Sequence, residues 1–162
     1  MDVLKFKLHE PASRNGVILD GFPRTIPQLD AYLKIAPIHL AFNIHMKFDI
    51  LVSKMLGRRL CSECGVSWNI CHIDEGEYQM EPLLPTDPDC KDCPTKYWSK
   101  RADDTTETIT QRMLAYAKHT EPLLNRFKDM GVLLSFEPKK GVKDYPKMYQ
   151  LIKPILDKAS AF

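Results

Sequence analysis

The chain has 162 residues and a formal net charge of +2, with 44% hydrophobic and 27% charged residues. This size suits about one domain, and the composition excludes disorder along the whole chain. The near-neutral charge excludes a polycation that coats nucleic acid. No run approaches the ~18 apolar residues of a membrane span, and the first residues lack the apolar core of a signal peptide. We therefore expect a globular protein that binds neither nucleic acid nor membranes.

Three short apolar runs predict strands. Gly16–Asp20 is bounded by turn residues and apolar on both faces, which is typical of a buried parallel strand. Residues 38–44 and 132–136 predict two more strands. Helical patterns separate these runs, so the sequence predicts an α/β fold with a parallel sheet.

Capping residues predict where the helices begin. Thr25 and Gln28 form a capping box that opens a helix to about residue 36. Asp49 caps a helix that ends at Gly57, and Asp104 with Glu107 three residues later opens another. The remaining predicted helices span residues 3–9, 120–131 and 144–159.

All the cysteines lie within one stretch of the chain, and four of them form two Cys-x-x-Cys pairs. They are Cys61, Cys64, Cys71, Cys90 and Cys93. The paired spacing predicts a closed, structural four-cysteine zinc site, although the pairs stand further apart than is common. Cys71 is more simply a free or partly buried thiol, while Cys71-His72 stays open as an alternative ligand pair.

The segment between the cysteine pairs is acidic, whereas basic residues gather at its two ends. Arg58 and Arg59 precede the first pair, and Lys100 and Arg101 follow the last. A zinc ribbon that binds nucleic acid needs an excess of Lys and Arg, so this pattern argues against one. It favours a small anion held at the ends of the insert. Solvated charges at helix termini are the alternative.

Asp20-Gly21-Phe22-Pro23-Arg24-Thr25 follows the first predicted strand, where open α/β sheets bind ligands. Asp20 can order the water shell of a Mg²⁺ ion that carries phosphates, and Arg24 can pair bidentately with a phosphate. Gln28 can hydrogen-bond a base edge. Spacing alone favours the plainer alternative, a strand-end turn with a surface ion pair.

Gly16 and Gly21 have the glycine spacing of a phosphate-binding P-loop, but this match is false. No Lys-Ser or Lys-Thr follows Gly21, and the intervening residues are an apolar run. The sequence contains no other Gly-Lys-Ser or Gly-Lys-Thr.

A further segment, Arg101-Ala-Asp-Asp with Arg112 beyond it, can bring two arginines onto phosphates. Asp103 or Asp104 can hold those arginines in place. Helix capping and surface ion pairs are the alternative, but they explain Asp104 better than they explain the two arginines together.

Together these segments resemble the adenylate kinase family of nucleoside monophosphate kinases. The resemblance runs from about residue 3 to residue 157 and rests on several motifs in the family's order. They are Gly16-Val-Ile-Leu-Asp-Gly-Phe-Pro-Arg-Thr25 with Gln28, Gly57-Arg-Arg59, the paired cysteines, Arg101-Ala-Asp-Asp-x-x-Glu107 with Arg112, and Thr120-Glu-Pro-Leu-Leu124.

The resemblance implies the substrates AMP and ATP, or GTP, with Mg²⁺ on the triphosphate. It implies that the AMP side comprises Gly21, Phe22, Pro23, Arg24 and Gln28, and that Asp20 helps to order Mg²⁺. Arg58 would contact the phosphates of the donor, and Arg101 and Arg112 would stabilise the transferred group. The donor base would meet Lys54, Ser67, Trp68 and the backbone of Lys140.

The resemblance further implies an incomplete P-loop-kinase-like sheet flanked by helices, with an inserted zinc-ribbon-like lid. We expect a partial core with the AMP-side segment over residues 1–60, the lid over 61–98 and the rest of the core over 99–162. Lys54 stands where the family usually has arginine, and the cysteine insert is longer than usual.

The family's N-terminal third, with its P-loop and first central strand, has no counterpart in this sequence. Three interpretations follow: a shortened form of the enzyme that is inactive alone, a chain whose P-loop and missing strand come from a partner chain, or a non-catalytic subunit of a larger assembly. The clustered cysteines indicate a reducing, intracellular compartment, either the cytoplasm or an organelle such as the mitochondrion.

Overall fold

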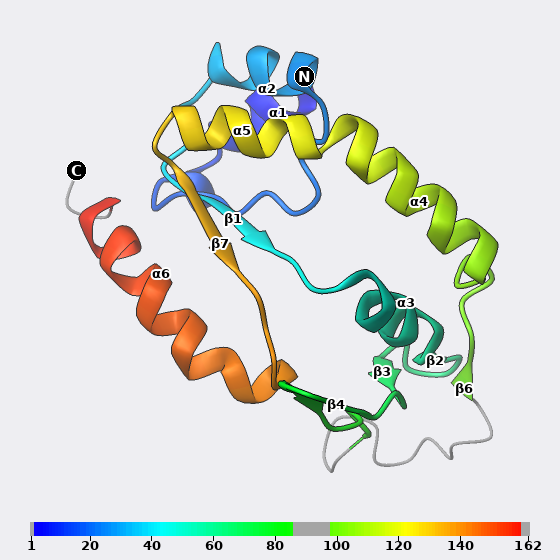
Figure 1. The fold of residues 1–162 in the computed structure, drawn as a ribbon. Coiled ribbons are helices and arrows are strands. Elements are labelled where there is room, and N and C mark those ends of the chain that lie inside the picture. The colour runs from blue at the N-terminus through cyan, green and yellow to red at the C-terminus, as the bar shows by residue number, and fades with distance from the viewer. Residues whose placement is uncertain (1, 86–97, 160–162) are drawn as a thin grey trace. The chain divides into compact units, whose positions relative to one another are not determined.

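The computed structural model describes residues 2–85 and 98–159, and its ribbon is drawn in Figure 1. The chain divides into two compact units. The first comprises Met1–Asn43, Leu114–Ser135 and Tyr149–Phe162. The second comprises Ile44–Met113 and Phe136–Met148. Each unit is described by itself below. In the described residues no helix is both long enough and apolar enough to cross a membrane.

Helices dominate the first unit. It contains α1 (Asp2–Leu8), η1 (Pro11–Ser13), α2 (Ile26–Leu33), α5 (Glu121–Asp129) and most of α6 (Tyr145–Ala159). α2 packs against α5 (Figure 1). Leu29 of α2 meets Leu123 and Phe127 of α5, and all three side chains are buried. This apolar contact is the core of the unit.

Two strands pair in a small parallel sheet, β1 (Ala41–Ile44) with β7 (Leu133–Phe136). The Ala41 amide donates to the Val132 carbonyl at 2.8 Å, and the His45 amide donates to the Phe136 carbonyl at 3.1 Å. From the first bond to the second, the donor and the acceptor each move four residues forward along the chain, as a parallel register requires. The strands predicted at 38–44 and 132–136 are confirmed, and helices flank them in an α/β arrangement.

The strand predicted at Gly16–Asp20 is wrong, because this segment has no regular secondary structure. Ile18 is 98% exposed and Val17 is 42% exposed, so the run is not buried either. A parallel strand needs a neighbour to satisfy its backbone groups. Among the described residues the sheet consists of β1 and β7 alone. The apolar run therefore has no strand to pair with.

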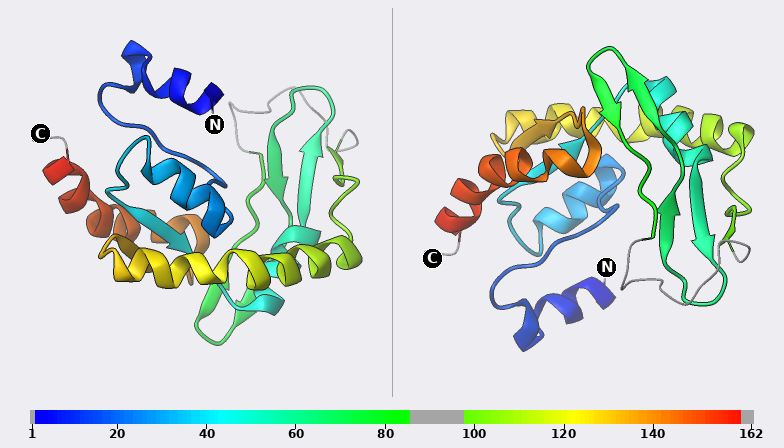
Figure 2. Two further views of the ribbon diagram at one scale, coloured as in Figure 1. Left: turned by 90° about the horizontal axis from the view of Figure 1, so that it is seen from above. Right: turned by 90° about the horizontal axis from the view of Figure 1, so that it is seen from below.

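The second unit begins with α3 (Phe48–Leu56) and holds two antiparallel hairpins, which are separate ribbons in Figure 2. The first hairpin joins β2 (Arg58–Cys61) to β3 (Ser67–Asn69), and the short strand β6 (Trp98–Ser99) pairs with the other edge of β2. The second joins β4 (Ile73–Glu75) to β5 (Tyr78–Met80). η3 (Gly141–Asp144) follows β7.

The two hairpins have separate apolar clusters. Cys61 and Trp68 are buried together in the first hairpin, with Trp98 of β6 packed against them. In the second, Ile73, Tyr78 and Met80 are buried against Ile50 of α3. The second hairpin thus shares its apolar cluster with a helix, whereas the apolar cluster of the first lies within that hairpin and β6.

Two predicted caps differ from the observed ones, and one is confirmed. The cap of α3 is Lys47, and Asp49 lies within the first turn. α4 (Thr106–His119) begins after Thr105, whose hydroxyl accepts from the Thr108 amide at 3.2 Å. Asp104 is not that cap, because its side chain is buried beside Arg58. The Thr25 cap on α2 is confirmed, since its hydroxyl accepts from the Gln28 amide at 3.4 Å.

Leu29 is fully buried between α2 and α5. Leu29→Ala should lower the free energy of unfolding by about 2–5 kcal/mol. The loss combines transfer free energy with the cavity left in the core. Urea unfolding followed by circular dichroism measures it. Leu114→Ala is the matched control, because Leu114 is 60% exposed and its change should stay within about 0.5 kcal/mol. Equal losses in both variants would show that this core is not the one described.

Candidate functional site

Asp103 holds two of the predicted phosphate-binding arginines. Its carboxylate accepts from Arg112 Nη2, and Arg101 Nε lies 3.3 Å from its Oδ1. Arg112 comes from the second turn of α4, and Arg101 comes from the segment between β6 and α4. The hydrogen bond from Arg112, then a backbone hydrogen bond and the charges of both arginines, lower the pKa of Asp103 below its ordinary value. The two guanidinium groups therefore share one ionised carboxylate.

Asp104 holds the third predicted arginine. Arg58 Nε lies 3.7 Å from Asp104 Oδ2, and the Asp104 side chain is fully buried. Neither carboxylate oxygen has a hydrogen-bond partner among the described residues. A buried carboxylate without such partners is costly, so the Arg58 charge is what stabilises it there.

Strand pairing brings the two ends of the cysteine insert together. In the antiparallel pair of β2 and β6, Leu60 lies opposite Ser99 and Cys61 opposite Trp98. Arg58 begins β2, and Arg101 lies two residues beyond the end of β6. Asp103 and Asp104 bind the three arginines and offset two of their three positive charges. We call these three arginines and two aspartates the arginine cluster.

Gly57 allows the chain to turn closely before Arg58. A Cβ on Gly57 would lie 2.5 Å from the Cys71 Cβ and 2.7 Å from Asn69 Oδ1. Asn69, which sequence reasoning missed, joins α3 to the strands: its Nδ2 donates to the Lys54 carbonyl at 2.7 Å, and its Oδ1 accepts from the Cys71 amide at 3.0 Å. A single asparagine in a strand carries no sequence signal for such a bridge.

The predicted donor-base residues lie in different surroundings. The Lys54 ammonium donates to the Cys71 carbonyl at 3.4 Å, and the Ser67 hydroxyl donates to the Arg59 carbonyl at 3.3 Å. Trp68 is 7% exposed and packs against Cys61, so little of its ring faces solvent. The Lys140 side chain is exposed, and its amide donates to Asp144 Oδ2 at 2.5 Å.

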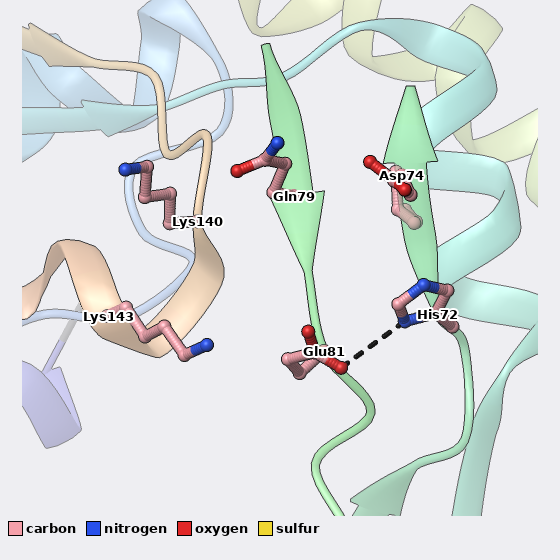
Figure 3. A pocket seen from close by; sticks show the side chains of 7 residues that line it. His72, Asp74, Gln79, Glu81, Lys140 and Lys143 are labelled. Carbon is pink, nitrogen blue, oxygen red and sulfur yellow. Dashed lines mark ion pairs between the residues drawn. The ribbon is translucent and has the colours of Figure 1, made fainter. Parts of the chain in front are cut away.

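Lys140 borders a shallow hollow of about 350 Å³ in the second unit. Figure 3 shows Lys140 and Lys143 on one side and residues of the β4–β5 hairpin on the other. On the hairpin side, His72 Nδ1 lies 3.4 Å from Glu81 Oε2. The hollow mixes lysine ammonium groups with carboxylates, and both kinds of side chain can hydrogen-bond a polar ligand.

The predicted AMP-side residues form a turn in the first unit. Arg24 Nε donates to the Gly21 carbonyl at 2.8 Å, and the Arg24 amide donates to Gln28 Oε1 at 2.7 Å. Gly21 has a φ of 69°, and a Cβ there would lie 2.6 Å from Arg24 Nη2. Glycine at this position therefore lets the guanidinium fold back. The structure brings Gly21, Arg24 and Gln28 together.

The other two members of this segment flank the turn. The Phe22 ring meets the Tyr32 ring of α2 edge-on at 6.1 Å, and the Phe22-Pro23 peptide bond is cis. Burial raises the pKa of the Tyr32 hydroxyl. Asp20 is exposed at the start of the turn.

Of the predicted zinc ligands, Cys61 ends β2 and Cys64 lies in the turn that leads to β3. The Gly65 amide donates to the Cys61 carbonyl at 3.0 Å, and Gly65 has a φ of 72°. Cys90 and Cys93 lie outside the described residues. Within the described ranges, no group of three or more His, Cys, Asp or Glu side chains could hold a metal ion. The four-cysteine site stays a prediction.

No protein-family model matches the chain, but curated relatives do. The probable adenylate kinase 6, chloroplastic, of Arabidopsis thaliana is 40% identical over 80% of this chain and 44% of its own length. The adenylate kinase of Clostridium tetani is 34% identical over 96% of this chain and 68% of its own length. The GTP:AMP phosphotransferase of Plasmodium falciparum is 34% identical over 85% of this chain and 60% of its own length.

The fold and these relatives define the class of protein. This chain belongs to the adenylate kinase family, as its motifs indicated. It spans about half to two thirds of the length of the curated relatives it matches.

The depressed pKa of Asp103 should rise toward its ordinary value when Arg112 is replaced. The hydrogen bond from Arg112 is its largest cause, so Arg112→Gln should shift this pKa more than Arg101→Gln. A depressed carboxylate stabilises the fold above its unfolded pKa and loses that contribution as pH falls through its folded pKa. Carbon-13 NMR titration of the carboxyl groups measures both shifts. An Asp103 pKa that ignores both substitutions would show that these arginines do not hold it.

Proposed function

We propose that this chain contributes to phosphoryl transfer from a nucleoside triphosphate to AMP, as a member of its family with the phosphate-binding arginines assembled. The arginine cluster is the observation that carries the proposal. Three guanidinium groups lie around two adjacent carboxylates, although the repulsion between like charges disfavours such an arrangement. A bound polyphosphate would stabilise it, because phosphate oxygens accept the paired donors of arginine.

The cluster suits the electrostatic demands of the reaction. Phosphoryl transfer spreads negative charge over the moving group, and positioned guanidinium groups stabilise that charge. Arg101 and Arg112 are each about 44% exposed at their side chains, so both can reach a ligand while Asp103 holds them. Asp103 and Asp104 act here as positioning residues, since they touch the arginines rather than the substrate.

The Gly21–Arg24 turn with Gln28 would hold AMP. Arg24 carries the charge for the phosphate, and its fold-back contact with the Gly21 carbonyl is a single hydrogen bond that a phosphate can replace. Gln28 Oε1 already accepts from the Arg24 amide, so its amide group remains for a base edge. Mg²⁺ enters with the triphosphate and shields its charge, and Asp20 is the exposed carboxylate that can order its water shell.

The donor is ATP or GTP. Lys54, Ser67, Trp68 and the backbone of Lys140 are the residues proposed to face its base. One relative is named as a GTP:AMP phosphotransferase, and the others are named simply as adenylate kinases. An intracellular location, in the cytoplasm or a mitochondrion, is proposed from cysteine usage, while two Arabidopsis relatives are designated chloroplastic.

The β2–β3 hairpin supports a zinc-bearing lid with Cys61, Cys64, Cys90 and Cys93 as ligands. A tight turn carries the first pair, with a positive φ at Gly65. The Cys61–Trp98 register sets the chain that follows the second pair beside the first pair. A zinc ion bound by four thiolates would be structural and would fasten the two ends of the insert.

A second interpretation, a non-catalytic subunit or a chain completed by a partner, is favoured by the exposed apolar run at 16–20. Ile18 is 98% exposed, and a neighbouring parallel strand would pair the backbone of this run. The 162 residues contain no Gly-Lys-Ser or Gly-Lys-Thr, so we expect the chain by itself to bind nucleotide without turnover.

Replacing single arginines should affect the binding of AMP and the binding of the triphosphate separately. Arg24→Ala should weaken AMP binding by roughly 10- to 100-fold, and Arg101→Ala should weaken binding of the Mg²⁺ triphosphate by a similar factor, because a charge-assisted hydrogen bond contributes about 1.5–3 kcal/mol. NMR titration reaches the millimolar range needed for such weak binding.

Arg14→Ala is the matched control, since Arg14 is exposed and lies outside both sites. It should change neither affinity. Binding that ignores Arg24 and Arg101 would contradict the proposal. A coupled-enzyme assay on the same samples decides the second interpretation: turnover by the 162-residue chain, lost in Arg24→Ala, would refute the expectation that it is inactive alone.

The purified chain should contain about one zinc ion, and Cys61→Ser or Cys93→Ser should release it, because a closed site needs all four thiolates. Elemental analysis measures the metal, and thiol titration measures the cysteines. Cys71→Ser is the matched control and should retain the metal. A metal-free preparation in which all five thiols titrate freely would rule out the site.

A further inference from the structure

The β4–β5 hairpin is joined to the segment that follows β7 through Tyr78. This residue is 1% exposed, and its ring packs with Ile50, Ile73 and Met80. Its hydroxyl donates to Glu137 Oε1. The ring is anchored in the apolar cluster and the hydroxyl reaches across to the next element, so Tyr78 links the two.

Lys139 completes this link. Its Nζ lies 2.8 Å from Glu137 Oε2, 2.8 Å from Glu77 Oε1 and 3.0 Å from Tyr78 Oη. The ammonium also lies 4.1 Å from the centroid of the Tyr78 ring, within the range of a cation–π contact. Burial acts to lower the pKa of Lys139, but its bonds to Glu137, Glu77 and Tyr78 raise it overall. Two carboxylates, from the hairpin and from the segment after β7, thus share one ammonium.

The backbone beside Lys139 is held from two sides. The Gln79 amide of β5 donates to the Lys139 carbonyl at 2.8 Å. Asp144 Oδ2 accepts from the amides of Lys139, at 2.7 Å, and Lys140, at 2.5 Å. The Lys140 carbonyl accepts a long bond of 3.3 Å from the Lys143 amide. Lys139 and Lys140 therefore have a fixed backbone.

We propose that Tyr78 is a positioning residue for the base of the phosphoryl donor: through the side chains of Glu137 and Lys139 it holds the segment that carries the Lys140 backbone against the β4–β5 hairpin. This inference rests on the proposed function, in which the Lys140 backbone meets that base. A carbonyl that is held in place before binding loses less conformational entropy when the base arrives. The hairpin belongs to the cysteine insert. The insert would therefore help to bind the base of the donor.

Tyr78 and the first cysteine pair belong to different apolar clusters. Tyr78 packs with Ile50 of α3, whereas Cys61 and Trp68 form their own cluster. None of the Tyr78 contacts described above is made to Cys61 or Cys64. Removing zinc and removing the tyrosine hydroxyl should have different effects.

Tyr78→Phe tests the proposal, because it deletes the hydroxyl and keeps the ring. Glu137→Gln is a second variant that weakens the same link from the other side. Glu75→Gln is the matched control, since Glu75 lies exposed on β4 of the same hairpin. Two measurements are made on the 162-residue chain: amide hydrogen exchange of Lys139 and Lys140 without nucleotide, and NMR titration with Mg²⁺-ATP, Mg²⁺-GTP and AMP.

Both test variants should exchange these two amides at least fivefold faster. Both should bind the preferred triphosphate at least fivefold more weakly, and their AMP affinity should stay within twofold. Glu75→Gln should match the unmodified chain throughout. A merely structural role would weaken AMP and triphosphate binding alike, and that result would overturn the positioning role.

Unchanged triphosphate affinity in both variants would overturn the positioning role and leave the proposed function standing, provided that the unmodified chain binds AMP and a triphosphate. An unmodified chain that binds neither nucleotide would overturn both proposals. The exchange rates then still show whether the tyrosine hydroxyl holds the backbone. The two failures are therefore distinguishable.

Discussion

Like charges repel, and the candidate site exists because two adjacent aspartates overcome that repulsion. Asp103 binds Arg101 and Arg112, and the buried Asp104 faces Arg58. Each pair on the surface contributes little alone, but a shared carboxylate holds two guanidinium groups at once. The third arginine is Arg58 of β2. The antiparallel pairing of β2 with β6 brings the chain after the cysteine insert back beside β2. The ends of the insert depend on this pairing, and the proposed binding of phosphates depends on it too.

The two hairpins of the second unit contact different elements. The β2–β3 hairpin carries Cys61 and Cys64 and packs on β6, so it determines how the ends of the insert meet. The β4–β5 hairpin packs on α3 and bonds to the Lys139 backbone, so it determines how the segment after β7 is held. The β4–β5 hairpin is thereby attached to the rest of the unit at two points, α3 and the segment after β7.

Local patterns predicted several elements whose deciding interaction is local, although the Asp49 cap is wrong. The Thr25 cap forms with an amide three residues away, and the strands at 38–44 and 132–136 appear as β1 and β7. The run at 16–20 has an equally good strand pattern, yet it stays exposed, because a parallel strand is stabilised by a neighbour that a local pattern cannot supply. Asp104 is a residue type that often caps helices, but its side chain is buried beside Arg58. Thr105 caps the helix instead.

The sequence by itself determined the family, the α/β class and the residue types of the candidate site, because ordered motifs and periodic patterns are properties of the chain alone. Only the tertiary structure decided which charges meet. The pairing of Arg58 with Asp104 joins residues 46 positions apart, and the Tyr78–Glu137 bond joins residues 59 positions apart. Such contacts depend on strand register and on packing between elements. No spacing along the sequence encodes either one, and both the arginine cluster and the Tyr78 link arise from them.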